Sequence, residues 1–145
     1  MININILDEY SSYVNPEIMN NVCESALKII YSGIEVDLSI VITSDLVSND
    51  LNLRFRGIDS PTDVLSFSSN EIDPDNGHRY IGDIIISLPR VVEQAKLASH
   101  PLENEIYLLL VHGLLHLFGY DHSTKEEEKN MWDKQNLILS NLGYS

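Results

Sequence analysis

The chain has little of what would place it in a membrane or an oxidising compartment. Its one cysteine, Cys23, excludes an internal disulfide, and in an apparently helical stretch it is expected to be buried and unreactive. The apolar run at residues 106–111 is far too short to cross a bilayer. The opening MININILDEY lacks the basic segment of a secretory signal. We therefore expect a cytoplasmic protein without a membrane partner.

Basic residues are also scarce. The chain has 9 lysines and arginines against 22 aspartates and glutamates, which gives a formal net charge of −13. This balance argues against broad electrostatic binding of nucleic acid, because neutralising many phosphates takes clustered cations. A polyanion would have to be held locally. The basic residues in the middle of the chain are Arg54, Arg56, Arg79, Arg90 and Lys96.

The 145 residues contain no internal repeat, low-complexity tract or long linker, so we predict a single domain over residues 1–145. Apolar and alternating patterns predict strands at 2–7, 34–43, 63–68 and 81–87. Helical spacing predicts helices at 16–32, 44–55, 88–98, 102–118 and 124–141. Strands dominate the first two thirds without a regular alternation with helices. This order indicates an α+β fold, with a small mixed sheet of about four strands packed by helices.

Two segments carry more specific predictions. The helix at 44–55 is predicted to be capped by Ser44 and to bury Leu46, Leu51 and Phe55. The segment 69–80 is rich in turn-forming residues and is predicted to be a loop or a hairpin tip between the last two strands.

The stretch HGLLHLFGYDH, residues 112–122, holds three of the five histidines. His112 and His116 are four residues apart on the predicted helix, so their rings project from nearly the same side, one turn apart. Gly119 is expected to end this helix, because glycine most easily takes the left-handed conformation there. His122 can then approach the open side of the pair. Three nitrogen ligands with a vacant fourth position are typical of catalytic zinc, so the spacing predicts a site for one Zn²⁺ ion.

The same stretch fits the metzincin pattern H-E-x-x-H-x-x-G-x-x-H at every fixed position except one. Gly113 stands where those peptidases keep the glutamate that serves as general base. A metal site without that base favours other chemistry, and phosphodiester hydrolysis is one such reaction. Water on zinc has a lowered pKa, and a cation can stabilise the charge that gathers on phosphate oxygens. Arginine suits this task, since its planar donors match a phosphate.

Three segments resemble the YbeY family of bacterial rRNA maturation factors. They are LNLRFRGIDSPTDVLSF (51–67), IGDIIIS (81–87) and VHGLLHLFGYDH (111–122), and they occur in the family's order and at its approximate separations. The resemblance implies an α+β fold and a zinc-bearing endoribonuclease specific for single-stranded RNA. It further implies a role in processing the 3′ end of small-subunit rRNA and in ribosome quality control.

Carried over by position, the resemblance implies His112, His116 and His122 as metal ligands. It implies Arg56, which follows an aromatic residue and precedes glycine, as the catalytic arginine. The implied partners are single-stranded RNA, in particular rRNA, and the ribosome or its small-subunit proteins. One position departs from the family, which commonly continues LSF with proline, whereas this chain has Ser68. That departure bears on the local loop geometry and not on the metal ligands.

Five other polar residues are weaker candidates for the same site. Asp63, Ser66 and Asp83 could line a cleft or orient ligands, although Asp and Ser beside turns more often cap or face solvent. Asp121 could accept a ring N–H from a histidine, as zinc sites usually require. Glu105, on the histidine-bearing helix, could support a ligand from behind, although a charged residue near a helix N-terminus needs no such role.

Two other classes of function stay open. One is a zinc-dependent peptidase or amidase, which the metzincin-like spacing favours and Gly113 disfavours. The other is a non-catalytic, zinc-containing ribosome-assembly factor, whose acidic charge would suit docking on a basic ribosomal protein. A fully closed metal coordination sphere would favour the second alternative. The sequence leaves the oligomeric state open.

Overall fold

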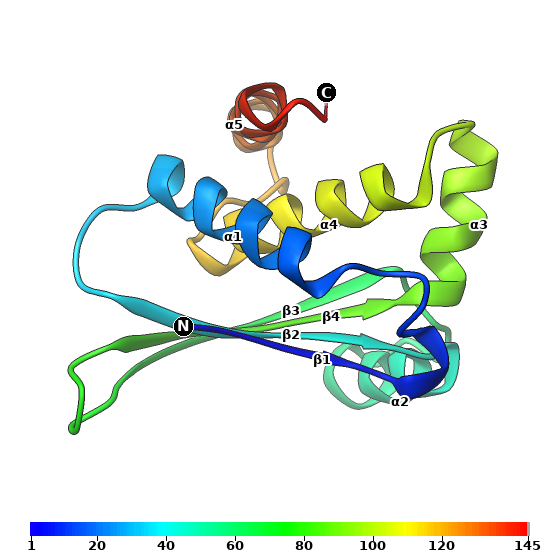
Figure 1. Cartoon of the computed structure of the whole chain (residues 1–145), viewed down its shortest axis with the longest axis horizontal. Helices are drawn as coiled ribbons and strands as arrows, with labels where there is room; N and C mark the ends of the chain where they lie inside the picture. Colours follow the sequence, from blue (N-terminus) through cyan, green and yellow to red (C-terminus); the bar gives the residue numbers. More distant parts are fainter. Residues whose placement is uncertain (145) are drawn as a thin grey trace.

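Four strands form a mixed sheet, which confirms the predicted α+β class (Figure 1). The computed structural model describes residues 1–144. In spatial order, the strands are β1 (Ile2–Ile6), β2 (Val36–Thr43), β4 (Arg79–Ser87) and β3 (Val64–Ile72). The pairs β1–β2 and β2–β4 are parallel, whereas β3 runs antiparallel to β4. β3 therefore forms one edge of the sheet.

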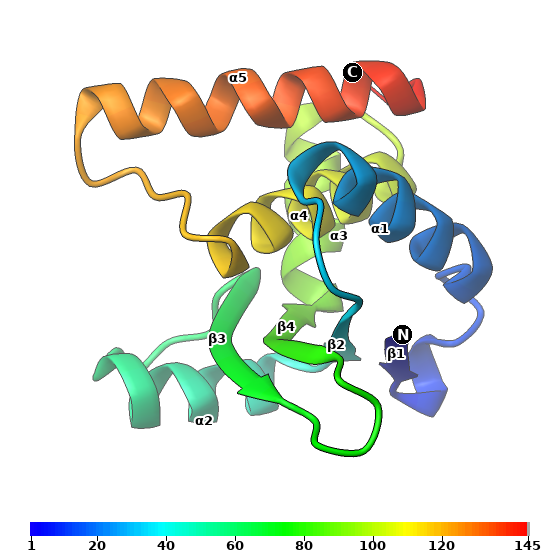
Figure 2. The same cartoon turned by 90° about the vertical axis from the view of Figure 1, so that its left-hand side faces the viewer.

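Helices cover the two faces of this sheet unequally (Figures 1 and 2). They are α1 (Pro16–Ile30), α2 (Asp45–Arg56), α3 (Leu88–Ala98), α4 (Leu102–Leu117) and α5 (Lys125–Leu142), with a short 3₁₀ helix at Asp8–Tyr10. The bounds of the five helices agree with the predicted ones to within two residues. α1 and α4 pack together on one face, α2 lies on the other, and α5 stacks on α1 and α4 from outside. In residues 1–144, no helix has the length and apolar character needed to cross a membrane.

The main core lies between the sheet and the layer made by α1 and α4. Alternate residues of β2 face these helices, so Leu38, Ile40 and Ile42 are buried there, beside Ile84 and Ile86 of β4. The histidine-bearing helix α4 contributes a buried apolar side made of Ile106, Leu109, Leu110, Gly113, Leu114 and Leu117. Each buried Leu or Ile side chain contributes roughly 1.5–3 kcal/mol relative to an exposed one. This packing holds α4 firmly against the sheet.

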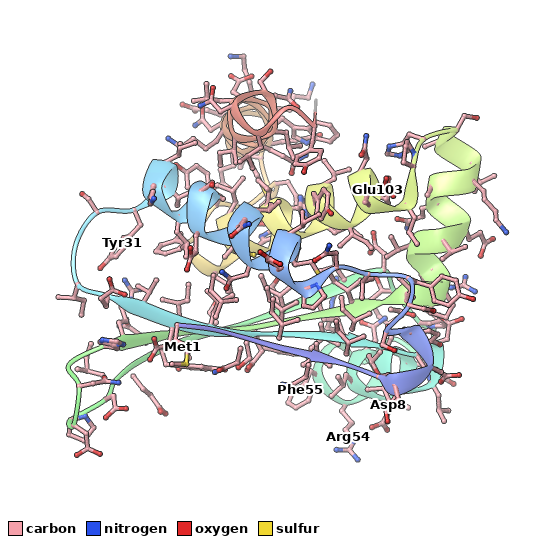
Figure 3. The ribbon with its side chains drawn as sticks, viewed as in Figure 1. Met1, Asp8, Tyr31, Arg54, Phe55 and Glu103 are labelled. Carbon is pink, nitrogen blue, oxygen red and sulfur yellow. The ribbon has the colours of Figure 1, made fainter. Side chains whose placement is uncertain are left out.

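The side of α2 that was predicted to be buried is largely exposed. The Ser44 hydroxyl does cap the helix, accepting a hydrogen bond from a backbone N–H at 3.4 Å. Leu46, however, is 80% exposed and Phe55 is 64% exposed, while Leu51 is only half-buried. Phe55 lies near the sheet surface that α2 partly covers (Figure 3), with its ring centroid 5.1 Å from that of Phe67. The predicted orientation of the helix is therefore wrong.

Polar residues take the inner side of α2 instead. Ser48 and Asn52 are buried, and both bind the loop that follows the helix. The Ser48 hydroxyl donates to the Thr62 carbonyl at 2.8 Å, and the Asn52 amide donates to the Ser60 carbonyl at 2.9 Å. A buried carbonyl without a hydrogen bond is costly. Hydrogen bonding to the carbonyl groups of this loop therefore outweighs burial of the apolar side of the helix.

The turn-rich segment 69–80 is a hairpin tip, as predicted, but the turn is shorter. β3 continues to Ile72 and β4 begins at Arg79, so only residues 73–78 connect them. Ser68, the residue that departs from the family pattern, lies within β3 and pairs with Gly82. Gly82 has a φ of +138°, and a Cβ there would lie 2.0 Å from the Phe67 carbonyl oxygen. Glycine is therefore required at 82 for the two strands to approach.

Candidate metal centre

The three predicted histidines come together at the C-terminal end of α4. The Nε2 atoms of His112 and His116 are 3.1 Å apart. A nitrogen of His122 completes a group in which the three potential ligand atoms all lie within 4.8 Å of one another. Two nitrogens bound to one tetrahedral zinc ion, each about 2.0–2.1 Å from it, lie about 3.3 Å apart. The spacing of the first pair therefore fits a shared metal ion.

The end of α4 explains how His122 reaches this pair. Gly119 has a φ of +94°, which is the left-handed conformation predicted for it. The Tyr120 N–H donates to the Leu115 carbonyl at 3.0 Å, and the Gly119 N–H donates to the His116 carbonyl at the same distance. These two bonds close the helix in a Schellman motif. The chain then leaves the helix axis, and His122 follows in the loop that leads to α5 (Figure 2).

Asp121 shapes this loop through local hydrogen bonds. One carboxylate oxygen accepts the His122 backbone N–H at 2.7 Å, and the other accepts the Ser123 hydroxyl at 2.8 Å. The carboxylate therefore accepts these two local hydrogen bonds, and not the histidine ring N–H that the sequence suggested. Asp121 therefore fixes the backbone that presents His122.

A cleft of about 450 Å³ opens over the three histidines. Ser66 and Ser68 line one wall, because alternate residues of β3 share a face. Arg56 lines the cleft from the last position of α2, and Gly57, with a φ of +70°, turns the chain directly after it. The arginine and the three histidines thus share one cleft, although they lie far apart in the sequence.

Asp63 is a further residue of this cleft. Its Oδ1 accepts the Val64 backbone N–H at 2.8 Å and the Thr62 hydroxyl at 3.2 Å. Both bonds hold the start of β3. The carboxylate therefore lines the cleft while serving the local backbone.

Asp83 and Glu105 lie elsewhere, so their candidate roles in this site are wrong. Asp83 belongs to the opposite face of the sheet, where it accepts a hydrogen bond from the Tyr80 hydroxyl. Glu105 is 7% exposed near the start of α4 and pairs with His100, with 2.6 Å between Oε2 and Nε2. The reasons are geometric, because a strand alternates its faces and because α4 places Glu105 about two turns from His112.

Gln135 of α5 contacts the metal centre, and the sequence had not suggested it. The side chain is 5% exposed, and its Oε1 lies 3.1 Å from Nδ1 of His112. A weak signal existed, since Gln135 is a polar residue in an otherwise apolar buried stripe made by Met131, Ile138 and Leu139. Sequence periodicity shows that such a residue is buried, but it does not identify its partner.

Burial lowers the pKa of both helix histidines. For His112, burial is the largest cause, the hydrogen bond with Gln135 raises the pKa, and His122 lowers it. For His116, burial again comes first, followed by repulsion from His112 and His122. Both rings are therefore neutral at neutral pH. A metal ion binds only the neutral imidazole, so the folded chain favours metal binding before any ion arrives.

Lowering the pH from about 7 to about 5 is expected to destabilise the metal-free protein in part through these two rings. An unfolded histidine has a pKa of about 6.5, and the folded values of His112 and His116 lie below their ordinary value. The unfolded chain therefore binds more protons in this window, and stability falls as the pH drops toward the folded pKa. Urea unfolding at a series of pH values measures the slope. The double variant His112→Asn, His116→Asn should show a flatter slope, and an unchanged slope would contradict the assignment.

Gly113, which stands at the position of the metzincin base, packs closely against the sheet. A Cβ atom at this position would lie 3.0 Å from the Ile84 side chain of β4. This contact is tighter than usual, so a side chain at position 113 would require Ile84 to shift by a few tenths of an ångström. The site therefore has the spacing of the peptidase motif without the residue that makes it a peptidase.

A three-histidine cluster at the floor of an open cleft, on an α+β scaffold, defines a candidate metal-dependent hydrolase. The family model described as Endoribonuclease YbeY matches residues 4–143. The chain belongs to the YbeY endoribonuclease family, which confirms the resemblance seen in the sequence.

Similar proteins agree with this assignment over nearly the whole chain. A protein of Roseiflexus sp. (strain RS-1) named Endoribonuclease YbeY is 39% identical, covering 99% of this chain and 94% of its own. A protein of the same name from Brevibacillus brevis is 40% identical, covering 99% of this chain and 98% of its own. The solution structure of a Thermotoga maritima protein aligns with a TM-score of 0.60 at 27% identity, covering 98% of this chain and 91% of that one.

Proposed function

We propose that this protein is a zinc-dependent endoribonuclease that cleaves single-stranded RNA in the cytoplasm, with residues 1–145 acting as one catalytic domain. The observation that carries the proposal is the cleft in which Arg56 lies together with His112, His116 and His122. Membership of the YbeY family supports the reaction class.

The three histidines are the proposed ligands of one Zn²⁺ ion. Their donor set fits, since imidazole nitrogens are common zinc ligands and the cluster found within residues 1–144 has three members. A zinc ion held there would supply a Lewis acid for a phosphoryl oxygen and activate water at neutral pH. The side of the cluster that faces the cleft leaves room for water and substrate, as an open catalytic site requires.

Arg56 is the proposed catalytic residue. Its guanidinium would bind the scissile phosphate and stabilise the negative charge that grows on the phosphate oxygens in the transition state. The planar donors can make two parallel hydrogen bonds to a phosphate, which a single ammonium group cannot. α2 lies on the opposite side of the sheet from α4 (Figure 2), and Arg56, its last residue, lines the cleft.

The proposed physiological substrate is the 3′ region of small-subunit rRNA, with the ribosome or its small-subunit proteins as partners. The net charge of −13 supports a basic protein partner, since complementary charge steers and orients association. The decisive experiment combines metal analysis with RNA cleavage. Purified protein should contain zinc and cleave single-stranded RNA in preference to a duplex. A chelator should abolish cleavage, and added zinc should restore it.

RNA affinity is expected to depend only weakly on salt. Within residues 1–144, Arg56 is the one lysine or arginine that lines the cleft, so few phosphates can be neutralised. For single strands the slope of log K against log salt is about −0.7 per neutralised phosphate. Affinity measured between low and physiological salt should therefore give a shallow slope. A slope that corresponds to about ten phosphates would mean that RNA binds a different surface.

A further inference from the structure

We propose that Gln135 is a positioning residue of the metal centre, which holds His112 in the tautomer that presents Nε2 to the ion. This inference rests on the proposed three-histidine metal site. Gln135 comes from α5, which stacks outside the layer that carries the ligands (Figure 2). The final helix would thus take part in metal binding without contributing a ligand.

The surroundings of Gln135 favour its contact with His112. The side chain is 5% exposed and shares the buried side of α5 with Met131, Ile138 and Leu139. A buried amide that lacks a hydrogen-bond partner destabilises the folded state by about 1–3 kcal/mol. The Oε1 atom of Gln135 lies 3.1 Å from Nδ1 of His112. An amide oxygen only accepts, so the proton of the neutral imidazole lies on Nδ1.

This hydrogen bond decides what Nε2 of His112 can do. With the proton on Nδ1, the Nε2 lone pair is free and points toward Nε2 of His116, 3.1 Å away. In the other tautomer, the His112 Nε2–H would donate to His116 Nε2 over that same distance. Such a pair would satisfy itself and occupy the lone pairs that the ion needs. Gln135 therefore favours the tautomer in which the Nε2 lone pair of His112 is available to the ion, and this is the tautomer that can bind metal through Nε2.

The chemistry of the amide also makes the inference testable with closely matched variants. Gln135→Met keeps the length and helix propensity of the side chain but removes the acceptor. Gln135→Glu keeps the acceptor and adds a negative charge beside the ligand, as in the carboxylate–histidine–zinc arrangement. Loss of such a partner typically weakens metal binding by about 10- to 100-fold. We therefore expect Gln135→Met to bind zinc about 10- to 100-fold more weakly, and Gln135→Glu to bind at least as tightly as the parent.

The zinc affinity is measured by competition with a chromogenic chelator, and the stability of each metal-free variant by urea unfolding. Ile138→Val is the matched control, because it trims the same buried side of α5 without a polar contact. It should lower stability slightly and leave zinc affinity unchanged. If Gln135→Met binds zinc as tightly as the parent, or weakens it no more than Ile138→Val does, the inference is overturned.

A second measurement decides the inference even if Gln135→Met fails to fold. Long-range proton–nitrogen NMR of the metal-free parent, at a pH where the ring is neutral, reports which nitrogen of His112 carries the proton. Protonation at Nδ1 is the expected result, and protonation at Nε2 would refute the positioning role. Neither readout needs RNA. A parent that positions His112 correctly but cleaves nothing would refute the proposed function and leave this inference standing.

Discussion

Replacing Arg56 by alanine is expected to lower kcat for RNA cleavage by about a hundredfold to a thousandfold while metal content and melting temperature stay at parental values. The guanidinium lies in the cleft and takes no part in the core or in the histidine cluster, so its loss should leave both intact. The guanidinium would bind phosphate oxygens whose negative charge is greatest in the transition state. The loss should therefore fall mainly on kcat. Single-turnover cleavage of a single-stranded RNA measures it, beside zinc analysis and thermal melting.

Two further variants test whether the effect comes from the positive charge alone, from the planar guanidinium, or from any loss of charge on α2. Arg56→Lys should recover only part of the lost rate, because an ammonium keeps the charge but loses the planar pair of donors. Arg54→Ala is the matched control, since Arg54 lies on the same helix, pairs with Asp50 at 3.3 Å and is mostly exposed. It removes the same charge and should cleave at close to the parental rate.

The outcome also decides between the candidate functions. Cleavage by Arg56→Ala at the parental rate would show that this arginine is not catalytic. If the parent protein, fully loaded with zinc, cleaves no RNA at all, the non-catalytic assembly-factor hypothesis becomes the better explanation of the site.

Replacing His116 by alanine is expected to remove most of the bound zinc and most of the stabilisation that zinc provides. The three histidines would act as a unit under the proposed function, because one ion needs all of their nitrogens within reach. An ion that binds only the folded chain stabilises it by about 2.7 kcal/mol at a free concentration 100 times its dissociation constant. The variant should therefore melt at nearly the same temperature with and without zinc, whereas the parent should gain stability when zinc is added. Metal analysis and melting curves test both parts.

His78→Ala serves as the control for removing a histidine outside the cluster. His78 lies in the turn between β3 and β4, outside the metal motif. It is half-buried, and its Nδ1 lies 3.1 Å from an Asp37 carboxylate oxygen. This variant should keep the full zinc content and the stabilisation by zinc. Equal zinc content in the parent and in His116→Ala would rule out the three-histidine site.

The sequence by itself determined the helices and the histidines of the candidate metal site. The apolar stripe of α4, the spacing of His112 and His116 and the helix stop at Gly119 all depend on contacts between residues a few positions apart. Helical periodicity and the conformational freedom of glycine are local properties, so they can be read without knowledge of the remaining chain. The number of strands and the class of the fold followed from the same local patterns.

Only the tertiary structure decided which distant residues lie beside those histidines. It placed Arg56 in the cleft and Gln135 behind His112, and it put Asp83 on the far face of the sheet. It also turned Ser48 and Asn52 of α2 inward to satisfy the loop beyond the helix, against the apolar pattern. These outcomes depend on strand register, on hydrogen bonds between separate segments and on the docking of whole helices. Such contacts leave no periodic trace in the sequence, because each is fixed by the packing of residues that are far apart along the chain.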